Sequence, residues 1–200
     1  MKKMLIILAL LIPLAGCSSP AASLHPLIPS EQAIAVPGLS GAWAEEEAAA
    51  NEGGGTVWTF EEQKNREYTL TVQDPDQESS YVFAVRLARL GDYLFVDAIL
   101  KETTIQGKNA DTDGLWIPVH YFGRIEVDQD QLHVRLLGSD WLDAALKDGR
   151  TDLRHEMTDE DTISFLTAPT ADLQEFAIRY AWDEEVFSYQ CDFWRRKPVK

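Results

Sequence analysis

The sequence has few cysteines, few positive charges and no apolar run long enough to cross a membrane. Its 200 residues include two cysteines, and 18 Lys and Arg residues stand against 33 Asp and Glu residues, which gives a formal net charge of −15. Nucleic-acid binding depends on Lys and Arg side chains that neutralise phosphates, so this charge argues against a nucleic-acid partner. It also disfavours flat contact with an anionic lipid surface.

The main apolar run, residues 4–12, is much shorter than the roughly 20 residues that a membrane-spanning helix needs. Lys2 and Lys3 precede this run, and small residues follow it. A charged start, a short apolar middle and a small-residue end are typical of a secretory signal peptide. We therefore expect residues 1–16 to be removed.

The segment ends in Leu14-Ala15-Gly16-Cys17, which resembles the lipobox of bacterial lipoproteins. The resemblance implies that the Cys17 sulfur is diacylated, that the chain is cut before it and that the new amino terminus is usually acylated too. In a Gram-negative host, Ser18 in place of Asp implies sorting to the outer membrane. The expected location is then the cell envelope, with a lipid anchor in the outer membrane and the protein facing the periplasm. The alternative is an ordinary secreted protein with an incidental cysteine.

The remainder of the chain is expected to form one domain. Residues 17–38, the lipidated cysteine with a segment rich in Pro, Ser and Ala, predict a flexible tether with an r.m.s. reach of about 25 Å, and residues 39–200 the domain itself. With Cys17 acylated, Cys191 can form no internal disulfide. We expect it to be buried beside Phe187, Tyr189 and Phe193.

From Leu39 onward the hydrophobic period is two, which is typical of strands with one buried face. About eight strands are predicted, at 39–43, 56–61, 67–73, 81–90, 92–100, 117–127, 132–138 and 162–168. Their even spacing favours a sandwich or a closed barrel. Two helices are predicted, a short one at 139–149 capped by Ser139 and Gly149, and one near the carboxyl terminus at 170–185.

The first predicted strand carries Gly41-Ala42-Trp43, which resembles the Gly-x-Trp that opens lipocalin barrels. The resemblance implies a mainly β fold, an antiparallel up-and-down barrel of about eight strands, with Gly41 and Trp43 at its closed end. Arg154 is a candidate for the family's late arginine, and the loop at 128–131 departs from the family's Thr-Asp-Tyr-like motif. Segments 89–99 and 165–176 are also similar to those of uncharacterised bacterial lipoproteins, which implies no activity.

Motifs for chemistry are few. His120 and His133 lie in predicted strands without metal-ligand spacing. Residues 109–114 resemble the start of a calcium loop, but His120 occupies the position of the closing Glu, so a solvated turn is expected. Neither a Gly-x-Ser-x-Gly elbow nor a phosphate-binding loop occurs. We predict no catalytic residues, no metal and no cofactor.

Three functions remain open. The first is the binding of a small apolar ligand in the barrel, and the second is a non-enzymatic module that binds an envelope protein and has a barrel filled by side chains. The third is a hydrolase of unknown class. The first two differ in the barrel interior, because no ligand fits if large aromatic side chains fill it. The five aromatic candidates are Phe60, Tyr68, Phe83, Phe95 and Tyr121.

The lipobox resemblance predicts the chemistry of the mature amino terminus. Mass spectrometry of the wild-type protein should show acyl chains such as palmitate on Cys17. The variant Cys17→Ser should carry none, because the acylated sulfur is gone, and should not be processed by the lipoprotein route. An unmodified Cys17 in the wild-type protein would contradict the assignment.

Overall fold

The computed structural model describes residues 19–46, 55–74, 78–105, 108–109, 118–157 and 163–196. The signal peptide, Cys17 and most of the calcium-like loop lie outside these residues, so the sequence-based statements about them stay predictions. Within the described part, no helix has the length and apolar character needed to cross a membrane.

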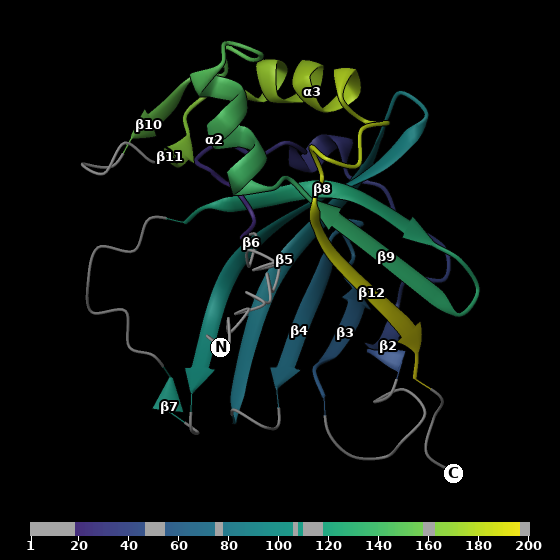
Figure 1. The fold of residues 1–200 in the computed structure, drawn as a ribbon. Coiled ribbons are helices and arrows are strands. Elements are labelled where there is room, and N and C mark those ends of the chain that lie inside the picture. The colour runs from purple at the N-terminus through teal and green to yellow at the C-terminus, as the bar shows by residue number, and fades with distance from the viewer. Residues whose placement is uncertain are drawn as a thin grey trace, which may run out of the picture.

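Eight antiparallel strands form a closed barrel, as Figure 1 shows. Each strand pairs with the next barrel strand along the chain, and the last pairs with the first, so the connection is up-and-down. The strands are β2 (Gly41–Ala44), β3 (Val57–Glu62), β4 (Tyr68–Asp74), β5 (Ser79–Leu90), β6 (Tyr93–Ile105), β8 (His120–Val127), β9 (Gln131–Leu136) and β12 (Tyr189–Arg195). The predicted mainly β barrel is confirmed.

The alternation of side chains explains why these segments form the wall. On β4, Leu70 points inward and pairs with Phe60 of β3 and Phe83 of β5, while Thr69 and Thr71 point outward. Successive side chains on a strand face opposite sides, so one period-two pattern supplies both the lining and the outer face. The β5–β6 hairpin closes through Gly91, whose φ of 60° suits a two-residue turn.

One predicted strand lies outside the barrel, and one barrel strand was missed. Within 162–168 the structure has β11 (Ile163–Leu166), which pairs with β1 (Ala22–Ser23) and β10 (His155–Met157) beside the barrel. The eighth barrel strand is instead β12, which pairs with β9 and β2. Its residues alternate between apolar and polar from Tyr189 to Phe193, which is the period-two pattern of a strand.

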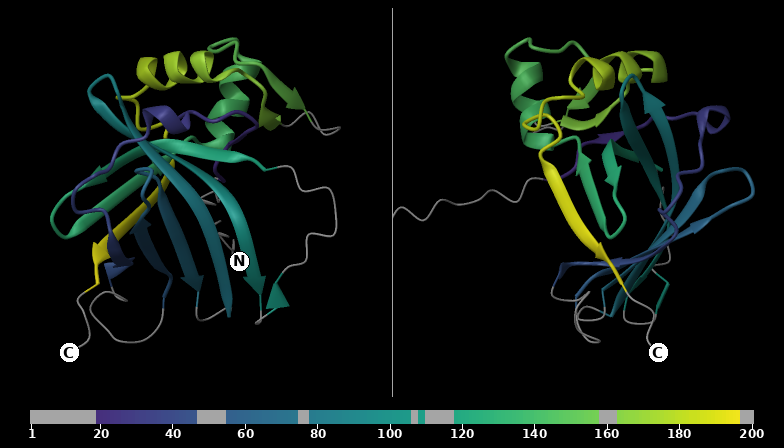
Figure 2. Two further views of the ribbon diagram at one scale, coloured as in Figure 1. Left: turned by 180° about the vertical axis from the view of Figure 1, so that it is seen from behind. Right: turned by 90° about the vertical axis from the view of Figure 1, so that its right-hand side faces the viewer.

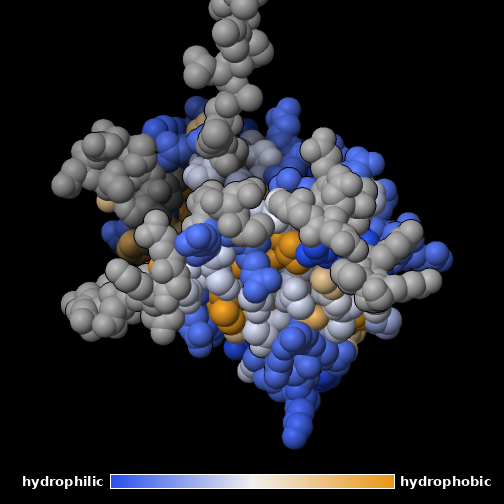
Figure 3. Space-filling model, turned by 90° about the horizontal axis from the view of Figure 1, so that it is seen from below, coloured by the Kyte–Doolittle hydropathy of each residue, from blue (hydrophilic) through white to orange (hydrophobic). Residues whose placement is uncertain are grey.

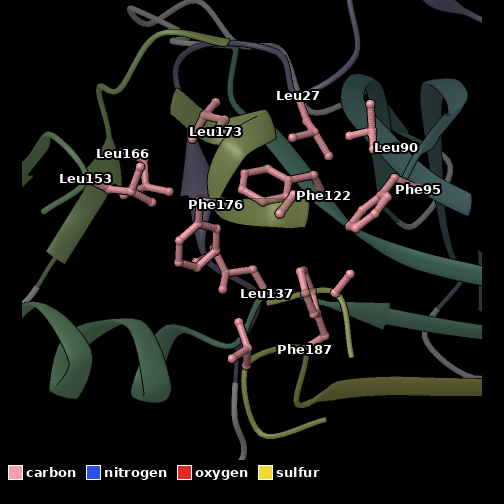
Figure 4. Packing of buried hydrophobic residues seen from close by; sticks show 14 of the residues in the cluster. Leu27, Leu90, Phe95, Phe122, Leu137, Leu153, Leu166, Leu173, Phe176 and Phe187 are labelled. Atoms are coloured by element: carbon pink, nitrogen blue, oxygen red, sulfur yellow. The ribbon is translucent and has the colours of Figure 1, made fainter. Parts of the chain in front are cut away.

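A second core lies outside the barrel wall. The connection from β9 to β12 contains α2 (Ser139–Lys147) and α3 (Thr170–Arg179), which lie together over one end of the barrel (Figures 1 and 2). Their apolar faces pack on outward side chains of β5, β6 and β8 to form what we call the outer core. Figure 4 labels ten of its members, Leu27, Leu90, Phe95, Phe122, Leu137, Leu153, Leu166, Leu173, Phe176 and Phe187.

Both predicted helices exist, with different ends. Gly138 rather than Ser139 is the N-cap of α2, and the Ser139 hydroxyl lies 2.9 Å from that of Ser19. Gly149 follows the C-cap Asp148 with φ of 68°, the left-handed conformation common just after helices. α3 ends at Arg179, before the predicted residue 185, and the chain then turns toward β12.

The segment predicted as a tether is part of the folded domain from residue 19 onward. Leu27 and Ile28 belong to the outer core, and Leu39 belongs to the core at the closed end of the barrel. The Ile28 amide donates to Asp97 Oδ2 at 2.9 Å, and the Ile34 amide donates to the Leu87 carbonyl at 2.8 Å. Apart from the short β1, the 3₁₀ helix η1 (Ser30–Gln32) and scattered bonds, the segment is irregular, so periodicity gave no sign of its burial.

Trp43 is buried in the packed part of the barrel interior, which we call the closed end. Its side chain is 0% exposed, and its indole N–H donates to the Leu39 carbonyl at 2.8 Å. Gly41 has φ of 128°, a conformation that favours glycine, and an added Cβ would lie 3.0 Å from the Arg195 guanidinium. A small residue two positions before Trp43 therefore makes room for Arg195.

Arg195, rather than Arg154, is the arginine that packs on this tryptophan. Its guanidinium lies 4.2 Å from the centroid of the Trp43 ring, a cation–π contact. It also donates to the carbonyls of Gly38, Ser40 and Gln129. Arg154, the candidate named from the sequence, is exposed and precedes β10, whereas Arg195 makes this contact.

Replacing Trp43 by Ala should lower the free energy of unfolding by about 3 to 5 kcal/mol, because a fully buried indole is lost and a cavity remains. Urea unfolding of the unlipidated domain measures this. The matched control is Trp182→Ala, which removes an indole that is 69% exposed and should change stability by less than about 0.5 kcal/mol. Equal effects of the two substitutions would contradict the assigned role of Trp43.

Candidate ligand site in the barrel

The barrel interior also contains a hollow, beside the packed core that includes Trp43. A cavity of about 370 Å³, which we call the barrel cavity, is enclosed by seven of the eight barrel strands and by the segment before β1. The residues that line it are Pro20, Trp58, Phe60, Leu70, Val72, Tyr81, Phe83, Val85, Val96, Ala98, Leu100, Tyr121, Ile125, Val134, Leu136 and Tyr189. None of these described residues is charged, so the cavity suits an apolar molecule.

The lining changes from buried to half-buried along the cavity. Val85, Val96 and Ile125 are buried and belong with Trp43 to the core of the closed end. Tyr81 and Leu100 are half-buried, which places them toward the mouth. Seen from below, some apolar residues lie toward the middle of the described surface, with hydrophilic residues among and around them (Figure 3).

Five aromatic residues were predicted to decide whether the barrel is filled or hollow. In the structure they lie in three different locations. Phe60, Phe83 and Tyr121 line the cavity without filling it. Tyr68 is buried at the closed end, where its hydroxyl accepts a hydrogen bond from the Val36 amide at 2.8 Å. Phe95 points out of the barrel into the outer core. The barrel interior is therefore packed in one part and hollow in another.

The side chains of the lining residues carry few polar groups, namely the hydroxyls of Tyr81, Tyr121 and Tyr189 and the indole N–H of Trp58. Burial raises the pKa of Tyr189, so this phenol stays neutral. Cys191 follows two residues later on the same inward face and packs against the core of the closed end. Burial, with the neighbouring Asp192 carboxylate, raises the pKa of its thiol to about 11. Such a thiol is a small apolar group rather than a nucleophile.

Histidine and carboxylate side chains meet on the outer face. His120 Nδ1 lies 2.6 Å from Asp97 Oδ1 in a buried pair, whose other carboxylate oxygen holds the Ile28 amide. His133 Nδ1 lies 2.7 Å from Asp192 Oδ1 between β9 and β12. Each carboxylate thus has a structural partner. In the described ranges, no group of three or more His, Cys, Asp or Glu side chains could hold a metal ion.

A second hollow of about 340 Å³ lies between α3 and the residues that precede β10. Asp152, Asp172, Glu175 and Arg179 surround it, and its walls are mainly polar. Arg179 is already bound to Glu175, at 2.6 Å. The two hollows are therefore chemically different, and the barrel cavity is the one with an apolar wall.

Sequence reasoning missed two contributors to the barrel cavity. Pro20 fell in the predicted tether, and no periodicity there could have shown that it borders the cavity. Tyr189 fell in the strand that was missed, although Tyr189, Cys191 and Phe193 alternate with polar Gln190 and Asp192. That alternation is the signal that would have found it.

No protein-family model matches the chain, and no curated protein or solved structure is significantly similar to it. The closed eight-stranded antiparallel barrel is established by the structure, whereas membership of the lipocalins or of a lipoprotein family is not. The class that the fold and the site define is a β-barrel protein with a cavity inside the barrel.

The raised pKa of Cys191 predicts slow reaction with a disulfide reagent such as Ellman's. In the unlipidated domain at pH 8, roughly one thiol in a thousand would be the reactive thiolate, and the rate should rise as the pH approaches 11. In urea the thiol should react completely and fast. Rapid stoichiometric reaction of the folded protein at pH 8 would show that Cys191 is not sheltered.

Proposed function

We propose that this protein is a lipid-anchored protein of the cell envelope that binds a small apolar ligand inside its barrel. The observation that carries the proposal is the barrel cavity of about 370 Å³ with its uncharged lining. Ligand sites are typically clefts of about 300 to 1,000 Å³ lined by apolar and aromatic side chains. The lipobox resemblance supports the anchor at Cys17 and the location in the outer membrane, facing the periplasm.

The cavity supports a slender ligand with a neutral polar group. Its volume is near the lower limit for ligand sites, so one hydrocarbon chain or a two-ring aromatic compound fits better than a large polycycle. The tyrosine hydroxyls can donate to a polar group but cannot neutralise an anion. With a net charge of −15, the protein also repels anionic ligands. Neutral or cationic amphiphiles should therefore bind at least as well as fatty acids.

The proposal predicts saturable binding of the neutral dye N-phenyl-1-naphthylamine to residues 18–200. In the variant Ala98→Trp, the indole would project into the cavity from β6 and should raise the dissociation constant about tenfold or more, equivalent to at least about 1.4 kcal/mol. Dye fluorescence measures binding, and affinity should survive moderate salt because the contact is apolar.

The matched control is Ala84→Trp on the neighbouring strand. Ala84 is half-buried but points out of the barrel, because it alternates with the inward Phe83 and Val85. This variant should bind the dye as the parent does. Absence of binding by the folded parent, or equal weakening by both substitutions, would overturn the proposal.

A second candidate function is binding of an envelope protein, and it is favoured by two exposed apolar side chains. Ile178 near the end of α3 and Trp182 just after it are 49% and 69% exposed. Exposed aromatic residues are enriched at protein interfaces. Such a partner would contact the outside of the domain, so Ala98→Trp would leave its binding unchanged.

A further inference from the structure

The residues that enter the domain from the amino terminus are fixed beside the barrel cavity. The Ser139 amide donates to the Ser19 carbonyl at 2.9 Å, and the Ala21 amide donates to the Leu137 carbonyl at 2.8 Å. The Ser19 and Ser139 hydroxyls lie 2.9 Å apart. Pro20, between these contacts, forms a β-bridge with Gly138 and lines the barrel cavity.

These contacts limit how far Cys17 can lie from the cavity. Cys17 precedes Pro20 by three residues, and an extended chain spans at most about 3.6 Å per residue. The Cys17 backbone is thus within roughly 11 Å of a residue that lines the cavity. The tether expected from the sequence would have allowed about 25 Å and no defined position. Any lipid on Cys17 is therefore attached beside the cavity.

We propose that one acyl chain of the lipid on Cys17 occupies the barrel cavity, so that the protein carries its own ligand. This rests on the proposed function, since it takes the barrel cavity as an apolar ligand site and Cys17 as the lipid site. The occupant is a saturated hydrocarbon chain, which matches the uncharged lining. The glyceryl group and the modified amino terminus stay outside, near Ser19.

The short chain between Cys17 and Pro20 explains why the attached acyl chain would bind in preference to a free apolar ligand. A chain that leaves the bilayer for an apolar cavity exchanges one apolar environment for another, so the transfer itself favours neither place strongly. A ligand on a short covalent link has an effective concentration on the order of millimolar. A free apolar ligand must compete with that concentration. Lipidation at Cys17 would thus regulate access to the cavity.

Photo-crosslinking in the lipidated full chain tests the proposal. Tyr81, a half-buried lining residue, is replaced by p-benzoylphenylalanine, and the purified lipoprotein is placed in nanodiscs of phosphatidylcholine. After irradiation and proteolysis, mass spectrometry should find the peptide with residue 81 joined to an acyl chain on the Cys17 peptide. The same replacement at Tyr121 gives a second position in case the first does not fold.

Two controls test whether a crosslinked adduct comes from an acyl chain on Cys17 that lies inside the barrel. The same photoreactive residue at the outward-facing Ala84 should give at least about tenfold less of the Cys17 adduct, because an acyl chain in the cavity lies inside the wall. A Cys17→Ser chain should give none.

The outcomes separate this inference from the proposed function. Adducts to phosphatidylcholine alone would overturn self-occupancy and leave a cavity that takes its ligand from the bilayer. Absence of any lipid adduct at both lining positions, in a protein whose unlipidated form binds the naphthylamine dye, would overturn self-occupancy but not ligand binding. Failure of the unlipidated form to bind the dye would count against the proposed function, and a Cys17 adduct would support self-occupancy in either case.

Discussion

The structure depends on the pairing of the last barrel strand with the first. β12 contacts β2 through the pairs Trp194 with Ala44 and Arg195 with Trp43, which are far apart in the sequence. Without this pairing β2 and β12 would both be free edges, and the inward side chains would face solvent. Closure removes the edges and creates an enclosed interior. Trp43 and Arg195 reinforce the seam, because one fills the interior and the other joins three carbonyls around it.

Within the closed barrel, the sizes of the inward side chains decide which part is packed and which is hollow. Bulky groups gather around Trp43, where Leu39, Tyr68 and Leu132 are buried with it. The residues that line the cavity include Ala98, Val72 and Leu136 as well as the aromatic Tyr81 and Phe83. Side chains around a circumference of eight strands leave an interior of small-ligand size unless they are large at every level. The cavity is thus a consequence of where the large residues lie.

The outer core holds the amino-terminal segment against the barrel, so the residues that follow Cys17 are part of the folded domain. α2, α3 and β11 supply an apolar surface on which Leu27 and Ile28 are buried. The buried Asp97 carboxylate is hydrogen-bonded to His120 and accepts a hydrogen bond from the Ile28 amide. These bonds hold the amino-terminal segment against the barrel. The described part of the domain therefore begins at Ser19, two residues after the proposed lipid site.

The sequence by itself determined most of the wall. Alternation in β3 to β9 is a local property, readable in segments such as Tyr68, Leu70 and Val72, and the stripe of Leu173, Phe176 and Ala177 likewise indicated α3. The predicted first strand with Gly41-Ala42-Trp43 exists as β2, and Trp43 is buried in the barrel interior. Only the tertiary structure decided which strand closes the barrel, which arginine packs on Trp43, where residues 19–38 lie and whether the interior is hollow. These depend on contacts between residues distant in the chain, and a local pattern carries no information about its distant partner.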